Sequence, residues 1–78
     1  MTVEVFSKGL KSLNEFNFED RISALAKLYR GRLISTSYKR LVGFYLEFYD
    51  NKTDAIDFTN EINKRCRVWN ITSTRMRK

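Results

Sequence analysis

The residues of this 78-residue chain best suited to bind a charged ligand are its fifteen Lys and Arg, and most of them are clustered. Residues 21–40 carry six cations and no acid, and residues 61–78 carry six cations and one acid, Glu61. Residues 1–20 and 41–60 are acidic, with net charges of −2 and −3. Since blocks of like charge produce surfaces that attract polyanions, the clustering predicts contacts with phosphate groups rather than a catalysed reaction.

The residue sets of common catalytic and metal sites are missing from the sequence. There is no His, the usual general base and metal ligand, and Cys66 is the only cysteine. Neither a P-loop signature nor a dinucleotide-binding glycine pattern occurs. Asp54 with Asp57, or Glu47 with Asp50, are carboxylate pairs able to hold a magnesium ion, although such pairs are usually solvated. We therefore expect no enzyme, no cofactor and no metal.

Length and composition predict one globular domain. A chain with 42% hydrophobic and 14% aromatic residues is too apolar to be disordered. No apolar run approaches the roughly 20 residues that cross a bilayer, and residues 1–10 lack the apolar centre of a secretory signal. Because Cys66 has no cysteine to pair with inside the chain, a reducing, cytoplasmic setting is expected, with no membrane partner.

The elements that must position the cations are predicted from apolar periodicity, beginning with a strand and a helix in the first half. Val3–Phe6 reads as a strand and residues 7–17 as a loop. Asn17 is expected to cap the following helix, with Asp20 as its capping-box partner, and Gly31 to end it. The apolar stripe of that helix consists of Phe18, Ile22, Leu25 and Tyr29.

Two β-rich segments, residues 32–37 and 41–49, flank Tyr38-Lys39-Arg40 and predict a hairpin. Residues on opposite faces of a strand alternate, and in the second strand one alternating set is uniformly apolar while the other is amphipathic. The apolar set, expected to face the core, is Val42, Phe44, Leu46 and Phe48. The amphipathic set, expected to face outward, is Leu41, Gly43, Tyr45, Glu47 and Tyr49.

The last part of the chain predicts a second helix and a fourth strand. Residues 50–52 form a turn, after which either Asn51 or Thr53 caps a helix. Residues 67–72 then form a strand carrying Val68, Trp69 and Ile71. The inner side of the helix is expected to bury Ala55, Phe58, Ile62 and Cys66. Residues 1–73 are thus one α+β domain, and residues 74–78 a basic C-terminal tail.

The element order β-α-β-β-α-β predicts a ferredoxin-like fold. This is a four-stranded antiparallel sheet in the order 4-1-3-2, with both helices on one face. The expected core consists of Ile22, Leu25, Phe44, Leu46, Phe48, Ile62 and Trp69.

Strand directions in this fold bring three connections to the same end of the molecule, which we call the cationic end. They are the first strand–helix loop, the hairpin and the junction before the last strand. Lys64 and Arg65 would also interact favourably with a helix dipole, so their position is compatible with ordinary surface charge. Arg30, Arg32 and the tail go to the opposite end. The cations of the cationic end are Lys8, Lys11, Lys39, Arg40, Lys64, Arg65 and Arg67.

Residues 43–50 (GFYLEFYD), followed by Asp54-Ala55 and Ile62-Asn63, resemble the third strand and second helix of an RNA-recognition motif. The resemblance covers about residues 43–63, and the element order agrees with that family. It implies an open sheet face on which outward aromatics of the third strand stack on bases. With Phe48 at the last aromatic of the motif, Tyr45 takes such a stacking position.

The sequence departs from that family at three positions of the stacking surface. Gly43 stands where the other third-strand aromatic belongs, and Leu41 replaces the basic residue that opens the motif. Glu4 replaces the aromatic of the first strand. Binding through loops, or binding of a protein instead of RNA, is compatible with these departures.

Two functions of different classes follow. In the first, a non-enzymatic domain binds RNA or single-stranded nucleic acid through the cationic end, with Tyr45 as a stacking residue. In the alternative, a compact protein-binding regulator inhibits a nucleic-acid-processing enzyme. A homodimer fits either function, because residues 33–37 form an exposed edge strand and Tyr45 with Tyr49 offers an apolar face.

Overall fold

A computed structural model describes residues 1–8, 15–49 and 52–77, with residues 15–18 described by their backbone. In this part of the chain the elements follow the predicted order β-α-β-β-α-β. Their bounds are β1 Thr2–Ser7, α1 Glu15–Leu28, β2 Gly31–Tyr38, β3 Val42–Phe48, α2 Lys52–Lys64 and β4 Ile71–Arg77.

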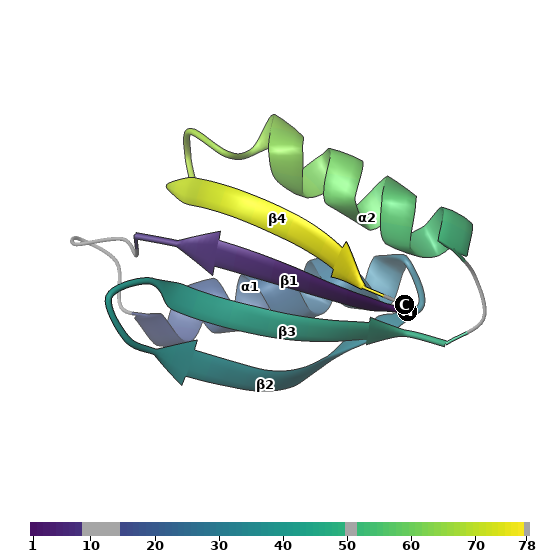
Figure 1. Cartoon of the computed structure of the whole chain (residues 1–78), viewed down its shortest axis with the longest axis horizontal. Coiled ribbons are helices and arrows are strands. Elements are labelled where there is room, and N and C mark those ends of the chain that lie inside the picture. The colour runs from purple at the N-terminus through teal and green to yellow at the C-terminus, as the bar shows by residue number, and fades with distance from the viewer. Residues whose placement is uncertain (9–14, 50–51, 78) are drawn as a thin grey trace.

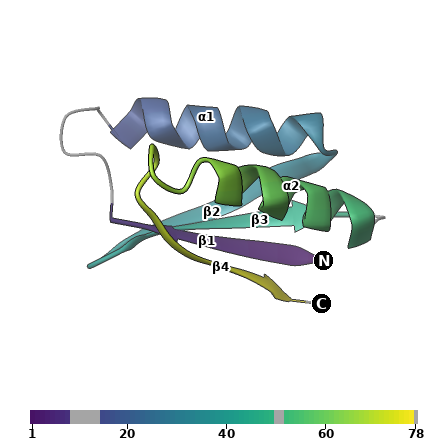
Figure 2. The ribbon, with the colours of Figure 1, turned by 90° about the horizontal axis from the view of Figure 1, so that it is seen from above.

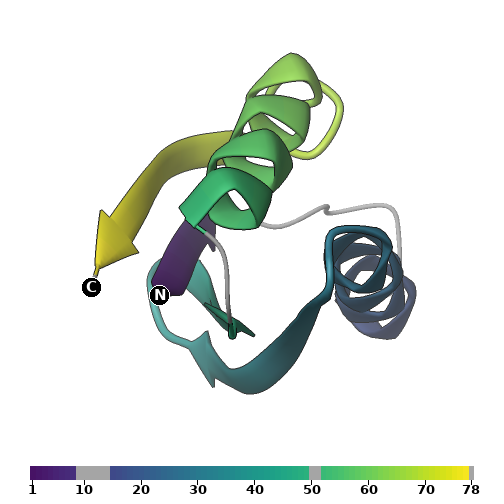
Figure 3. The ribbon, with the colours of Figure 1, turned by 90° about the vertical axis from the view of Figure 1, so that its right-hand side faces the viewer.

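The four strands form one antiparallel sheet in the order β2-β3-β1-β4 (Figure 1). Counted from the β4 edge, this is the expected order 4-1-3-2. Both helices lie over the same face of the sheet, as Figure 2 shows from above and Figure 3 from one end. The opposite face is not covered by either helix, and we call it the open face.

The core lies between the helices and the covered face of the sheet. Alternation along β3 directs one set of side chains inward, and Phe48 packs against Phe58 of α2 with ring centroids 5.1 Å apart. All seven residues of the predicted core are buried. The full set of buried apolar residues is Val3, Val5, Ile22, Leu25, Ala26, Val42, Phe44, Leu46, Phe48, Ala55, Phe58, Ile62 and Trp69.

The ends of the helices differ from the sequence prediction. α1 begins at Glu15, so Asn17 lies inside the helix and does not cap it. At the other end the residue with left-handed backbone geometry is Arg30 (φ 62°) rather than Gly31. Gly31 is instead the first residue of β2, where a Cβ atom would overlap the ring of Phe48. Close packing, and not a helix cap, therefore requires this glycine.

At the start of α2, Thr53 is not the N-terminal cap that was one of the two predictions. The helix already includes Lys52 and Thr53, so Lys52 is not in a turn and Thr53 does not cap the helix. Asn51, the other candidate cap, lies outside the described residues, as does Asp50.

The last strand begins later in the chain than predicted, at Ile71 instead of residue 67. Residues 65–70 form a turn in which the Trp69 amide donates to the Arg65 carbonyl (2.9 Å) and the Ile71 amide donates to the Cys66 carbonyl (2.9 Å). Asn70 adopts left-handed backbone geometry (φ 51°), which reverses the chain before β4. Cys66 is consequently exposed instead of buried.

The predicted basic tail is part of the sheet. β4 continues to Arg77 and pairs with β1 from Ile71 to Arg77, so residues 74–77 belong to the domain. Neither described helix is long and apolar enough to cross a membrane.

Candidate nucleic-acid interface

Two aromatic side chains lie together on the open face. Val3 and Val5 face the core, so alternation along β1 turns Phe6 to the other side, while Tyr45 faces outward from β3 as predicted. The two rings meet edge to face, with centroids 6.2 Å apart and an interplanar angle of 90°. Both side chains are half-buried. The pair therefore offers an aromatic surface to a ligand, and each ring holds the other in place.

Gly43 makes this arrangement possible. It lies opposite Phe6 in the sheet. A Cβ atom at Gly43 would stand 3.1 Å from the Tyr45 hydroxyl and 3.2 Å from a carbon of the Phe6 ring. Because such contacts are tight, a side chain here would push the rings apart. β3 thus has no aromatic side chain at Gly43, but the neighbouring strand β1 supplies one, Phe6, directly opposite.

Phe6 was not among the site residues predicted from the sequence. The signal was available, because Val3 and Val5 fix the inward set of β1 and leave Phe6 outward. What was missing was the register, which pairs Phe6 with Gly43 and Glu4 with Tyr45. Without this register, Phe6 cannot be placed next to Tyr45.

Charged residues surround the aromatic pair on the open face. Arg32 contacts Glu47 (3.6 Å) and Arg77 contacts Glu4 (3.2 Å), so both acids of this face are paired. Arg75 lies opposite Glu4 in the β1–β4 register and is exposed. Among the described residues of the open face, these five charges sum to +1, which favours an anionic ligand.

The cationic end predicted from the strand directions is present. Ser7 pairs with both Val42 and Ile71, so the end of β1, the hairpin and the start of β4 meet there. The Lys8 amide donates to the Asn70 carbonyl (3.1 Å), which joins the first and last of these connections. Figure 1 shows this end on the left. The structure brings together Lys8, Lys39, Arg40, Lys64, Arg65 and Arg67, whereas Lys11 lies outside the described residues.

Two of these cations share one acidic partner, Glu61. Glu61 accepts from Nζ of Lys64 (3.2 Å), the last residue of α2, and from the guanidinium of Arg65, the first residue after it. These hydrogen bonds, first that of Arg65 and then that of Lys64, lower the pKa of Glu61. The Arg65 guanidinium also lies over the Trp69 ring, 5.6 Å from its centroid. Lys64 and Arg65 are therefore weaker candidates for phosphate contacts than the sequence suggested.

The other four described cations of this end are exposed: Lys8, Lys39, Arg40 and Arg67. Within residues 1–8, 15–49 and 52–77, no acid forms an ion pair with any of them. Lys39 and Arg40 lie in the hairpin, which is hydrogen-bonded to α1. Tyr38 Oη and Thr36 Oγ1 both donate to the carboxylate of Glu19, at 2.9 Å and 3.1 Å. These four cations and the Phe6–Tyr45 pair constitute the candidate interface.

The carboxylates considered as magnesium ligands are described in part, because Asp50 lies outside the described residues. Among the residues that the structure describes, no group of three or more Cys, Asp or Glu side chains is placed to hold a metal ion. Asp54 and Asp57 lie on α2, and Glu47 is engaged by Arg32 across the open face.

Comparisons with protein-family models, with curated proteins and with solved structures find no match for this chain.

Proposed function

We propose that this protein binds single-stranded nucleic acid, with RNA as the first candidate, across the open face of its sheet and its cationic end. One observation carries the proposal: the Phe6–Tyr45 pair lies on the open face next to exposed cations that have no acidic partner in the described part of the chain. The element and strand orders also support a ferredoxin-like fold, to which RNA-recognition motifs belong.

Bases of a single strand would stack on the aromatic pair. Every base has a flat apolar face, and stacking on an aromatic side chain contributes about 1–3 kcal/mol per base. A duplex hides these faces, so an outward aromatic pair favours unpaired strands. Because Gly43 has no side chain, no atoms project from the sheet beside the two rings, and a base has room to approach them.

Phosphates would be neutralised at the adjoining end. Lys8 follows Phe6 by two residues, and Lys39 with Arg40 precedes Gly43 in the hairpin, so the cations flank the aromatic pair along two neighbouring strands. Arg75 adds a cation on the β4 side of the open face. Each phosphate contact to a single strand should steepen the dependence of log affinity on log salt by about 0.7.

The test is the affinity of a fluorescein-labelled uridine oligonucleotide of about 12 nucleotides, measured by anisotropy over a salt series. The variant Lys8→Ser/Lys39→Ser/Arg40→Ser should bind more weakly, with a slope smaller by about 2. The matched control is Arg21→Ser/Lys27→Ser/Lys52→Ser, which removes three exposed cations from the helices. Its affinity should fall less.

Three results would contradict the proposal. The first is that the wild-type protein shows no salt-dependent binding to the oligonucleotide. The second is that both triple variants lose affinity equally, since binding would then depend on net charge alone. The third is that only the helix variant loses affinity, which would move the interface to the covered side.

A further inference from the structure

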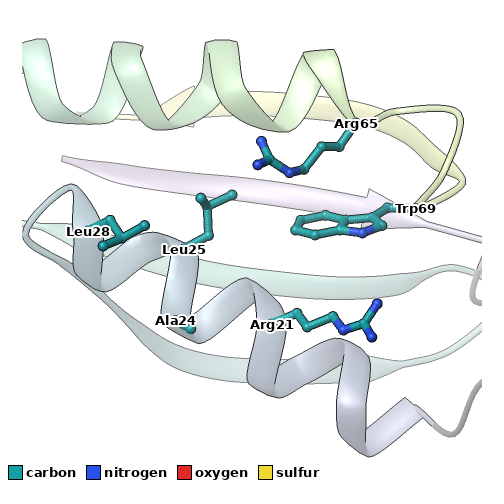
Figure 4. A pocket seen from close by; sticks show the side chains of 6 residues that line it. All are labelled: Arg21, Ala24, Leu25, Leu28, Arg65 and Trp69. Atoms are coloured by element: carbon teal, nitrogen blue, oxygen red, sulfur yellow. The ribbon is translucent and has the colours of Figure 1, made fainter.

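A groove of about 340 Å³ lies between α1 and the end of α2, on the side of the sheet opposite the Phe6–Tyr45 pair (Figure 4). Its lining comes from two separate parts of the chain, namely α1 and the turn 65–70 that follows α2. The lining residues are Arg21, Ala24, Leu25, Leu28, Arg65 and Trp69.

The floor of the groove is apolar and one of its walls is open to solvent. Leu25 and Trp69 are each only 8% exposed and form the floor. Leu28, on the same helix as Leu25, is 78% exposed, and Ala24 is exposed as well. A leucine this exposed beside an apolar hollow does not seal the core. It extends the apolar surface outward, where a partner can cover it.

Two arginines border this apolar surface from opposite sides. Arg21 projects from α1, and in the described part of the chain no acid is paired with it. Arg65 extends from the end of α2 over the Trp69 ring. The lining of the groove carries these two arginines and no acid, and Glu61 outside the lining offsets one of them by pairing with Arg65. The lining therefore retains a positive charge at Arg21.

We propose that the groove docks an acidic amphipathic segment of a partner protein. An apolar side chain of that segment would rest on Leu25, Leu28 and Trp69, and an Asp or Glu beside it would meet Arg21. Charge complementarity selects acid over base in the partner. The space between two helices is suited to a helical segment, whose apolar and acidic residues repeat every three or four positions.

The open wall favours a peptide over a small molecule. Sites for small ligands enclose about 70–90% of the ligand surface, whereas Ala24 and Leu28 leave this groove open along α1. A peptide does not need enclosure, because its backbone remains in water while one or two side chains enter. This proposal does not depend on nucleic-acid binding, since the groove lies on the helix side of the sheet and the Phe6–Tyr45 pair on the open face, although the turn 65–70 contributes to both sites.

Trp69 supplies a direct readout, because it is the only tryptophan of the chain and forms part of the groove floor. The probe is a helical peptide of about 14 residues with Leu on one face and Glu beside it. A second peptide carries Lys in place of every Glu. The acidic peptide should change the Trp69 emission saturably, and the basic peptide should not.

Two variants and one control locate the binding. Arg21→Glu should weaken binding of the acidic peptide by about tenfold or more. Leu28→Ser should weaken it too, without unfolding the protein, because Leu28 is already exposed. Lys27→Glu reverses a charge on the same helix outside the groove lining and should retain most of the affinity.

The proposal is overturned if the acidic peptide leaves the Trp69 emission unchanged, or if the basic peptide binds equally well. It is also overturned if Arg21→Glu and Lys27→Glu weaken binding by the same amount. Finally, a uridine oligonucleotide that competes with the peptide for Trp69 would identify the groove as a nucleic-acid site instead.

Discussion

The two faces of the sheet carry similar aromatic residues in different surroundings. On the covered face, Phe44 and Phe48 are almost completely buried and pack into the core beneath the helices. On the open face, Phe6 and Tyr45 contact each other over a glycine and remain half-buried. Alternating positions on β3 therefore divide into a set that holds the fold and a set that is available to a ligand, and Phe6 joins the second set from β1.

The cations show a similar division. Lys64 and Arg65 share Glu61 at the end of α2, whereas Lys39 and Arg40 in the hairpin are exposed and, within the described residues, lack an acidic partner. All four lie at the same end of the molecule. Clusters of cations in the sequence therefore overestimate the number of phosphate contacts, because only cations without an acidic partner are fully available to a phosphate.

The largest expected effect separates neighbouring residues of β3. Leu46→Ala should lower the free energy of unfolding by about 2–5 kcal/mol, because it leaves a cavity in the core. Tyr45→Ala should cost much less, since Tyr45 is half-buried on the other face. Urea denaturation of the two variants measures both values. If Tyr45→Ala unfolds the domain while Leu46→Ala does not, the faces of β3 are assigned the wrong way round.

A smaller effect is expected for Phe6→Ala. Loss of a stacking ring should reduce the binding free energy for the uridine oligonucleotide by about 1–3 kcal/mol. Tyr49→Ala is the matched control, because Tyr49 is an exposed aromatic beyond the other end of β3, with Arg32 over its ring. Equal losses in the two variants, measured by anisotropy, would mean that the Phe6–Tyr45 pair has no special role.

A still smaller effect is expected at the paired cations. Lys64→Ser/Arg65→Ser should leave the oligonucleotide affinity within about twofold, because Glu61 already occupies both side chains. Lys39→Ser/Arg40→Ser should reduce the slope against salt by about 1.4, the value for two phosphate contacts. The distinction between paired and unpaired cations fails if the first variant changes the slope as much as the second.

The smallest effect concerns Glu61 and pH. Since Arg65 and Lys64 lower its pKa, the ionised carboxylate stabilises the fold above its ordinary pKa of 4.5, and this contribution is lost as pH falls through the lower folded value. Glu61→Gln should therefore slightly lower Tm at neutral pH and have no effect in strong acid. A Tm difference that persists unchanged at low pH would show that the charge of Glu61 is not responsible.

The parts of the fold that follow from the periodicity of apolar residues within one strand or helix were predictable from the sequence. Alternation identified the inward set of β3, and three- and four-residue spacing identified Ile22 and Leu25 on α1 and Phe58 and Ile62 on α2. Neither inference requires knowledge of distant contacts, because each depends on one element having a buried side.

The chain between α2 and β4 was not predictable in this way. Val68 and Trp69 are residue types that favour strands, and they led to a strand at 67–72. The structure buries Trp69 from a turn instead, where its carbonyl accepts from Ser7 Oγ (2.8 Å). That contact joins residues far apart in the sequence, so local propensity cannot reveal it.

The candidate site was predicted in part. Tyr45 followed from the faces of β3, but Phe6 required the register between β1 and β3. The pairing of Glu61 with Lys64 and Arg65 was visible as i,i+3 and i,i+4 spacing on a helix, and weighing it would have reduced the number of expected phosphate contacts.

The most direct test of the central claim is a titration of isotopically labelled protein with the uridine oligonucleotide, followed by the backbone amide resonances in NMR spectra. The claim predicts that shifts concentrate at Phe6, Lys8, Gly43 and Tyr45 and in the hairpin, while Leu28 and the Trp69 indole remain unchanged. Shifts confined to α1 and Trp69, or no shifts at saturating oligonucleotide, would contradict it.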